Sequence, residues 1–155
     1  MPDVPTLDHI GIAVRSIEAC RSFYETVLGA EYEGEELVDS QEVRVAFFRA
    51  HHVRLELLEP TSADSPVHRF LERRGEGLHH VAFSVADIEG RIAALRESGI
   101  RMVDASPRTG SHGMRIAFIH PSSAHGVLTE LCERCGGPPE DSADRTSPGA
   151  GVGEA

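Results

Sequence analysis

Two stretches of the chain, residues 7–18 and 78–89, share one alternation of apolar and polar side chains. Over about eight positions in each, leucine, isoleucine or valine alternates with smaller or polar residues, which predicts a strand with one face against a core. Each stretch then reaches a residue suited to cap a helix, Ser16 in the first and Asp87 in the second. The pattern therefore predicts a strand followed by a helix at two places.

Apolar residues recur at helical spacing after each cap. The run from Ile17 to Leu28 is followed by Gly29, and the run that begins at Ile88 is followed by Gly99. Glycine just beyond such a run is typical of a helix end. Three more strands are expected after each helix, at 31–38, 43–49 and 53–58 in the first copy and at 101–104, 114–119 and 126–132 in the second.

The two copies form an internal repeat. His9 matches His80 at an offset of 71 residues, whereas Glu56 matches Glu130 at 74, and a longer loop at 121–126 explains the difference. At this size neither copy could bury its sheet face alone. We therefore expect an α+β fold of two β-α-β-β-β modules, related by a pseudo-twofold axis, whose sheets curve round one shared metal-binding cavity.

The domain boundaries follow from the repeat. We expect a single domain over residues 1–133, divided into module one at 7–59, a linker with a short helix at 60–77, and module two at 78–133. Residues 134–155 are rich in glycine, proline, serine and aspartate and almost free of large apolar residues. This composition predicts a disordered tail.

Composition narrows the function further. The net charge of −10 argues against nucleic acid and anionic membranes as partners, because neutralising phosphates needs a basic surface. All 15 basic residues are arginine, so Schiff-base chemistry on lysine is excluded. No apolar run approaches the length that spans a bilayer, and the N-terminus does not resemble a secretory signal. We expect a cytoplasmic location.

Three cysteines, Cys20, Cys132 and Cys135, are too few for a disulfide framework. The last two form a lone C-x-x-C without the further cysteines or histidines of a structural zinc site. We interpret them as one strand cysteine and one tail cysteine.

The repeat groups the candidate metal ligands into one set. A lone histidine on a strand is more often structural than a ligand, but a pseudo-twofold axis would bring His9, His80, Glu56 and Glu130 together. Strand alternation places His9 and Glu56 opposite the apolar residues beside them. Two imidazoles and two carboxylates suit a divalent ion such as Co²⁺, Mn²⁺, Ni²⁺, Fe²⁺ or Zn²⁺, and leave two octahedral positions for water or substrate.

At these residues the chain resembles the vicinal oxygen chelate superfamily, which has the glyoxalase I/bleomycin-resistance fold, and within it the methylmalonyl-CoA epimerases. The similarity covers residues 7–131 almost without gaps. The segments that carry it are 7–14, 56–60, 64–66, 70–71, 75–83, 112–113, 118–121 and 126–131.

The resemblance implies a cofactor and an activity. It implies one divalent metal ion on His9, Glu56, His80 and Glu130, with Co²⁺ favoured and Mn²⁺, Ni²⁺, Zn²⁺ or Mg²⁺ possible. It implies interconversion of (R)- and (S)-methylmalonyl-CoA through an enolate, with Glu130 as the first base. Some similar epimerases have glutamine in place of Glu56 and a glutamate where this chain has Val45, so the hypothesis here is that Glu56 is the second base.

The resemblance also implies an acyl-CoA substrate and a homodimer. His112, Gly113 and Arg115 are the candidate substrate contacts. Many relatives have lysine where this chain has Ser122, so any phosphate contact made by that lysine is missing or replaced.

Three alternatives use the same fold. A glyoxalase I-type lyase acting on a glutathione hemithioacetal would share the metal, the glutamates and the enolate chemistry. An extradiol-type dioxygenase would use two histidines and one carboxylate, so a fourth ligand at Glu56 disfavours it. A metal-free small-molecule binding protein would not need histidines and glutamates at equivalent positions.

Overall fold

Each half of the chain folds into strands and a helix in the repeating order that the sequence predicts, and the computed structural model describes residues 4–136. The first half contains β1 (Thr6–Ala13), α1 (Ile17–Ser22), β2 (Glu31–Val38), β3 (Val43–Ala50) and β4 (Val53–Pro60). After α2 (Pro66–Arg74), the second half contains β5 (Gly77–Ser84), α3 (Ile88–Glu97), β6 (Arg108–Thr109), β7 (Arg115–Ile119) and β8 (Thr129–Glu133).

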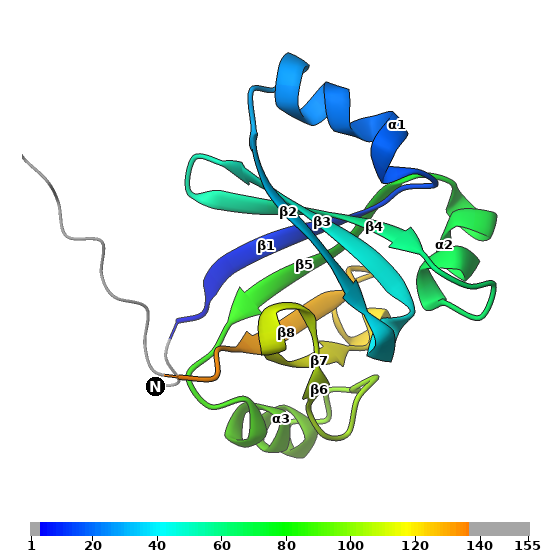
Figure 1. The fold of residues 1–155 in the computed structure, drawn as a ribbon. Coiled ribbons are helices and arrows are strands. Elements are labelled where there is room, and N and C mark those ends of the chain that lie inside the picture. The colour runs from blue at the N-terminus through cyan, green and yellow to red at the C-terminus, as the bar shows by residue number, and fades with distance from the viewer. Residues whose placement is uncertain (1–3, 137–155) are drawn as a thin grey trace, which may run out of the picture.

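One curled, open sheet joins all eight strands in the order β2-β3-β4-β1-β5-β8-β7-β6. The two halves meet where β1 pairs with β5 in antiparallel orientation, and on either side β1 pairs with β4 and β5 with β8 in parallel. The strand order therefore reads the same outward from this seam in both directions. Figure 1 shows α1 and α3 at opposite ends of the molecule, with β1 and β5 side by side between them. The predicted α+β fold with two related modules is confirmed.

Two hydrophobic clusters serve each module. In the first, α1 packs through Ile17 against Leu57 and Ile12 on the outer face of the sheet, and in the second, α3 packs through Ile88 against Leu131. The other two clusters lie around α2 and on the strands of module two, as the residue sets Ala13, Val38, Val43, Val45, Phe47, Leu58, Val67 and Leu71, and Ala82, Met114, Ile116, Phe118 and Cys132. His9 on β1 and Glu56 on β4 alternate with Ile12 and Leu57, so both side chains lie on the face of the sheet opposite to α1.

A glutamate at the end of the last strand of each module caps the helix of that module. Glu59 Oε2 accepts a hydrogen bond from the Ile17 amide at 2.8 Å, and Glu133 Oε2 accepts one from the Ile88 amide at 2.8 Å. A carboxylate at a helix N-terminus satisfies an amide that has no partner within the helix and interacts favourably with the helix dipole. The repeat thus extends to the contacts that hold each helix on its sheet.

The linker contains the expected short helix. The Ser65 side chain accepts a hydrogen bond from the Val67 amide at 3.2 Å, and Pro66 occupies the first turn of α2. Proline fits there because its missing amide would have no partner within the helix. The helix ends at Gly75, which adopts a positive φ of 73°.

The expected strand at 101–104 is wrong. In that segment only Met102 makes a β-bridge, with Ile119, and the edge strand is β6 further along the chain. The side chain of Asp104 accepts a hydrogen bond from the Phe118 amide at 2.8 Å. In a longer strand this amide would have donated to a backbone carbonyl. Local competition by an aspartate side chain therefore shortens the ladder.

The first predicted helix is also interrupted. After α1 the chain continues as a π-helical turn at Phe23–Val27, where the Leu28 amide bonds to the Phe23 carbonyl at 3.0 Å. Gly29 then ends the segment at φ 69°, as expected. The predicted disordered tail, 134–155, lies outside the described residues except for 134–136. Over residues 4–136, no helix is long and apolar enough to cross a bilayer.

Candidate functional site

Four polar side chains are buried beside the seam between the modules. His9 on β1, Glu56 on β4, His80 on β5 and Glu130 on β8 are each 2–4% exposed. Within residues 4–136 the other buried polar side chain is Ser65, which caps α2. Burying such groups is costly unless they are paired, protonated or bound to a cation, so their common location requires an explanation.

The four groups meet at the Nε2 atom of His9. This atom lies 3.2 Å from His80 Nε2, 3.4 Å from Glu56 Oε2 and 3.7 Å from Glu130 Oε1. His80 Nε2 is 3.3 Å from Glu130 Oε2. The structure thus brings together the four residues that the repeat pairs.

The donor set and its spacing fit a divalent ion. An ion with ligands at about 2.0–2.2 Å places neighbouring donor atoms about 3.0–3.6 Å apart. Three of the four distances above fall in this range, and the fourth, from His9 Nε2 to Glu130 Oε1, is 3.7 Å. His9, His80 and Glu130 offer donor atoms that all lie within 4.8 Å of one another and could hold a metal ion. Glu56 lies outside that group of three and touches it through His9.

Burial also sets the proton affinities. It raises the pKa of Glu130 to about 8, raises that of Glu56, and lowers that of His80 well below its usual value. Burial would lower the pKa of His9 too, but a hydrogen bond to Asp8 and the charges of Glu56 and Glu130 outweigh it and raise that pKa. Without a cation, Glu130 is therefore largely protonated and His80 neutral at neutral pH.

A small cavity opens beside these groups. Glu56, His80 and Glu130 line it, and the other lining residues are Val38, Gln41, Val45, Leu58, Ser111 and Ile116. The lining of the cavity therefore combines two carboxylates and an imidazole with aliphatic side chains. This arrangement suits a small polar group that carries an alkyl substituent.

The predicted substrate contacts lie near this cavity to differing degrees. His112 and Gly113 belong to the exposed 3₁₀ turn that also contains the lining residue Ser111. The His112 ring lies on Phe47 with centroids 4.2 Å apart, and its amide donates to Glu36 at 2.9 Å. This turn of module two therefore contacts strands of module one.

Arg115 is engaged elsewhere. Its guanidinium lies 2.5 Å from Glu89 Oε1 and 3.8 Å from Glu133 Oε2, and it is not among the residues that line the cavity. The structure does not bring it to the four-residue cluster. Ser122, at the position where many relatives have lysine, bonds through its hydroxyl to His120 Nδ1 at 2.7 Å.

Gln41 and Ser111 were missed by sequence reasoning although both line the cavity. The repeat could have indicated this turn, because Ser40 and Ser111 are 71 residues apart, as are Glu42 and Gly113. In the structure Glu42 and Gly113 both have positive φ, at 51° and 66°. The two turns are thus equivalent. Ser40 Oγ donates to the Thr109 carbonyl at 2.6 Å, which joins the two modules across the opening of the curled sheet.

Comparison with known proteins gives consistent matches over this region. The sequence profile of the glyoxalase/bleomycin resistance protein/dioxygenase superfamily matches residues 8–118. An uncharacterised protein of Bacillus subtilis (strain 168), YqjC, is 54% identical over 127 residues, which is 82% of this chain and 91% of that protein. The mitochondrial methylmalonyl-CoA epimerase of Bos taurus is 37% identical over 126 residues, 81% of this chain and 72% of the bovine protein.

A solved structure is similar in sequence and in shape. A variant of Streptomyces coelicolor methylmalonyl-CoA epimerase, in complex with 2-nitronate-propionyl-CoA, matches with a TM-score of 0.81 and 40% identity. The match covers 84% of this chain and 95% of the Streptomyces chain. The fold is therefore shared with an epimerase structure that is in complex with 2-nitronate-propionyl-CoA.

Proposed function

The chain belongs to the glyoxalase/bleomycin resistance protein/dioxygenase superfamily, and we propose that it is an epimerase that interconverts (R)- and (S)-methylmalonyl-CoA. The observation that carries this proposal is the pair of buried glutamates, Glu56 and Glu130, which flank two imidazoles from equivalent strands. The bovine and Streptomyces relatives, both epimerases of this substrate, support it over most of the chain.

The reaction needs an acid–base group on each side of one carbon. The C2 proton of methylmalonyl-CoA lies between a thioester and a carboxylate, so its removal leaves a planar enolate. Epimerisation returns a proton to the opposite face. Glu56 reaches the centre from β4 and Glu130 from β8, which lie on opposite sides of the β1–β5 seam. In our proposal each glutamate therefore serves one face of the planar species.

Proton affinity supports the role of Glu130. In the metal-free protein burial raises the pKa of Glu130 to about 8, and a bound cation would lower it again by favouring the carboxylate, which is the form that accepts the C2 proton. Glu56, whose pKa is raised in the same direction, takes the complementary role. Val45 lines the same cavity but has no ionisable group, so the second base is assigned to Glu56.

A divalent cation, held by His9, His80 and Glu130 with Glu56 as the fourth ligand, belongs to the proposal. When bound, it supplies positive charge that stabilises negative charge developing on substrate oxygens. We favour Co²⁺, with Mn²⁺, Ni²⁺, Zn²⁺ and Mg²⁺ as the alternatives to be compared. The neutral imidazole of His80 has a lone pair available for such an ion.

Binding of the rest of the acyl-CoA is assigned to the turn at 111–113. We propose that His112 and Gly113 contact the substrate beside Ser111, which lines the cavity. Arg115 is the weakest of the three candidates, because its guanidinium is paired with Glu89 and Glu133. A homodimer is proposed as the functional unit, to be checked by light scattering.

Isotope exchange tests the function directly. Methylmalonyl-CoA incubated with the protein in D₂O should gain one deuterium at C2, detected by mass spectrometry, and a single stereoisomer should become a mixture. Chelation should abolish the exchange and Co²⁺ should restore it. Absence of exchange with and without Co²⁺ would refute the epimerase assignment. Turnover of a glutathione hemithioacetal would then point to the lyase alternative.

A further inference from the structure

The residue directly before each histidine of the cluster contacts the outer ring nitrogen of that histidine. Asp8 Oδ1 lies 2.8 Å from His9 Nδ1, and His79 Nδ1 lies 2.9 Å from His80 Nδ1. Asp8 and His79 are themselves 71 residues apart and therefore equivalent in the repeat. The pseudo-symmetry of the cluster thus continues one layer further out, although the two outer residues differ in type.

These contacts decide which nitrogen of each imidazole carries its proton. A carboxylate can only accept, so the Asp8 contact places a proton on His9 Nδ1 and leaves Nε2 with its lone pair when the ring is neutral. If His80 Nδ1 donates to His79, the Nε2 lone pair of His80 is free as well. The two Nε2 atoms face each other at 3.2 Å, so two lone pairs meet at the centre of the cluster. Such an arrangement is favourable with a cation between them.

We propose that Asp8 and His79 are positioning residues that fix the tautomers and ring orientations of His9 and His80. Both Nε2 atoms can then coordinate one divalent cation. The inference rests on the metal site in the proposed function and extends it to residues outside the ligand set. A partner on the non-ligating nitrogen orients the ring and increases its basicity, and its removal typically weakens metal binding by about 10–100-fold.

Asp8 is the stronger of the two partners. Its side chain is 5% exposed, and its second oxygen lies 3.5 Å from Ser84 Oγ and 3.6 Å from a guanidinium nitrogen of Arg134. The carboxylate is therefore held from both sides and cannot turn away from His9 without losing these contacts. A charged acceptor also makes a stronger hydrogen bond than a neutral one.

His79 is held by packing. Its ring lies edge-on to Phe70 of α2, with centroids 5.0 Å apart. A neutral imidazole has one donor and one acceptor nitrogen, so His79 Nδ1, 2.9 Å from His80 Nδ1, can accept from that ring. The acceptor for His80 is therefore positioned by the linker helix, whereas the acceptor for His9 is positioned by ionic contacts.

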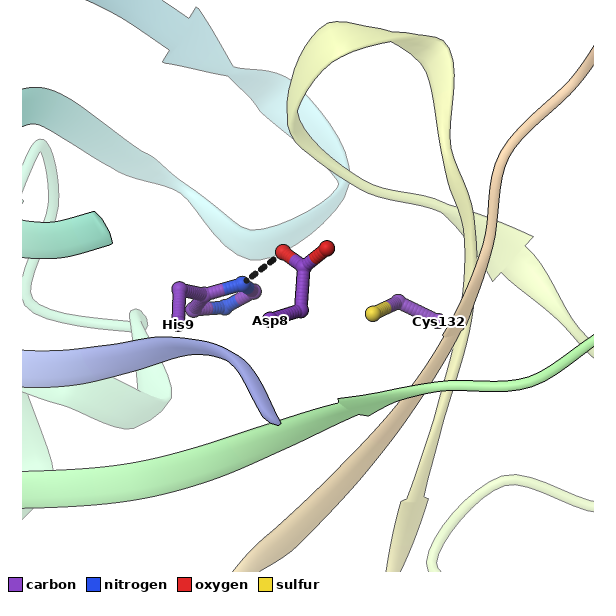
Figure 2. A group of neighbouring side chains, drawn as sticks. All are labelled: Asp8, His9 and Cys132. Atoms are coloured by element: carbon purple, nitrogen blue, oxygen red, sulfur yellow. Dashed lines mark hydrogen bonds and ion pairs between the residues drawn. The ribbon is translucent and has the colours of Figure 1, made fainter. Parts of the chain in front are cut away.

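A competing arrangement must be distinguished. Asp8, His9 and Cys132 also offer donor atoms that lie within 4.8 Å of one another, and Figure 2 shows the Asp8 carboxylate between the His9 ring and the Cys132 sulfur. An ion there would use His9 Nδ1 and a thiolate. Cys132 is fully buried among apolar residues such as Ala82 and Phe118, which disfavours a thiolate.

Cobalt binding to the metal-free protein tests the proposal without substrate. The dissociation constant is measured by calorimetry and the site geometry by the visible absorption of bound Co²⁺, for the wild type and for Asp8→Ala, Asp8→Asn, His79→Ala and His79→Asn. We expect Asp8→Ala to weaken binding by about 10–100-fold and to change the spectrum. Both asparagine variants keep an acceptor oxygen and should recover part of the affinity. His79→Ala should weaken binding less than Asp8→Ala.

Matched controls remove the same groups from the surface. Asp64→Ala and His52→Ala each delete an exposed side chain of the same type, and both should leave Co²⁺ affinity and spectrum unchanged. Thermal melting of each metal-free variant shows whether it folds. If Asp8→Ala does not fold, Asp8→Asn and His79→Ala supply the test.

Two results would overturn the positioning role. One is Co²⁺ affinity within about threefold of wild type, with an unchanged spectrum, in every folded variant that lacks one of the two acceptors. The other is a sulfur-to-cobalt charge-transfer band that disappears in Cys132→Ala, since the ion would then occupy the competing group. A protein that binds Co²⁺ as expected but exchanges no C2 proton would refute the epimerase activity and leave the positioning role intact.

Discussion

Gly11 lies directly against the imidazole ring of His80, across the antiparallel pairing of β1 and β5. A Cβ atom built on Gly11 would clash with three atoms of that ring. The glycine is therefore required by the close approach of a side chain from the other module. Its φ is not in the left-handed region, so a backbone turn is not the reason for it.

Gly11→Ala should displace the His80 ring while the sheet stays intact. We expect Co²⁺ affinity to fall by at least about tenfold, as for loss of an oriented ligand, and epimerase activity to fall with it. Calorimetry and the isotope-exchange assay measure the two effects. In a double-mutant cycle, Gly11→Ala should add little in a His80→Ala background, because the two changes share one target. Full additivity would show that Gly11 acts elsewhere.

Glu56→Gln and Glu130→Gln should each block epimerisation by about 100-fold or more, since each removes one acid–base group. If each carboxylate serves one face, a single variant still abstracts the proton from one stereoisomer. Each variant should then exchange deuterium into only one of the (R) and (S) substrates, and the two variants should prefer opposite ones. Stereochemically pure substrates and mass spectrometry test this. A Glu56→Gln variant with full activity would remove the second-base assignment.

The metal-free protein should lose stability progressively as pH rises from about 4.5 to about 8. The folded-state pKa of Glu130 is about 8, above its usual value, so the folded protein keeps a proton that the unfolded chain has released. That contribution is fully present below the usual pKa near 4.5 and is lost as pH rises through 8. The raised pKa of His9 acts in the same direction.

Melting temperatures across this pH range measure the effect. The Glu130→Gln variant, which cannot ionise, should show a flatter pH dependence than the wild type. Added Co²⁺ should reverse the trend in the wild type, because a cation favours the carboxylate and metal binding releases the proton. A slope that is the same in wild type and Glu130→Gln would contradict the assignment.

Removing either helix-capping glutamate should destabilise the fold without touching the cluster. Glu59→Ala and Glu133→Ala each leave a helix amide without its acceptor, and each should cost about 1–2 kcal/mol in the free energy of unfolding. Because the two caps belong to different modules, the losses should add within about 0.5 kcal/mol in the double variant. Chemical denaturation measures these values. Glu97→Ala, at the exposed end of α3, is the matched control and should change stability by less than about 0.5 kcal/mol.

The sequence predicted those parts of the fold that the repeat encodes twice. His9 with His80, and Glu56 with Glu130, could be paired because they stand at equivalent places of the repeat, 71 and 74 residues apart, and strand alternation puts them on one face. The same logic would have paired Ser40 with Ser111. Where the copies differ, prediction failed, as at 101–104.

Other features depend on contacts that no local pattern contains. Asp104 shortens a strand because its side chain accepts a hydrogen bond from the amide of Phe118, a residue 14 positions away. His79 follows the strand alternation that would turn it from the cluster, yet its ring nitrogen lies 2.9 Å from that of His80. Arg115 looked available from sequence, but its neighbours across β7 and β8 include Glu133, with which it pairs. Such outcomes follow from tertiary geometry.

The seam between β1 and β5 has one more consequence. Each module contributes one imidazole and one carboxylate to the cluster, so neither half possesses a site before the two have docked. Catalytic activity therefore depends on the association of the two halves. Any change that weakens the pairing of β1 with β5 should abolish activity while each half still retains its helix and its outer strands.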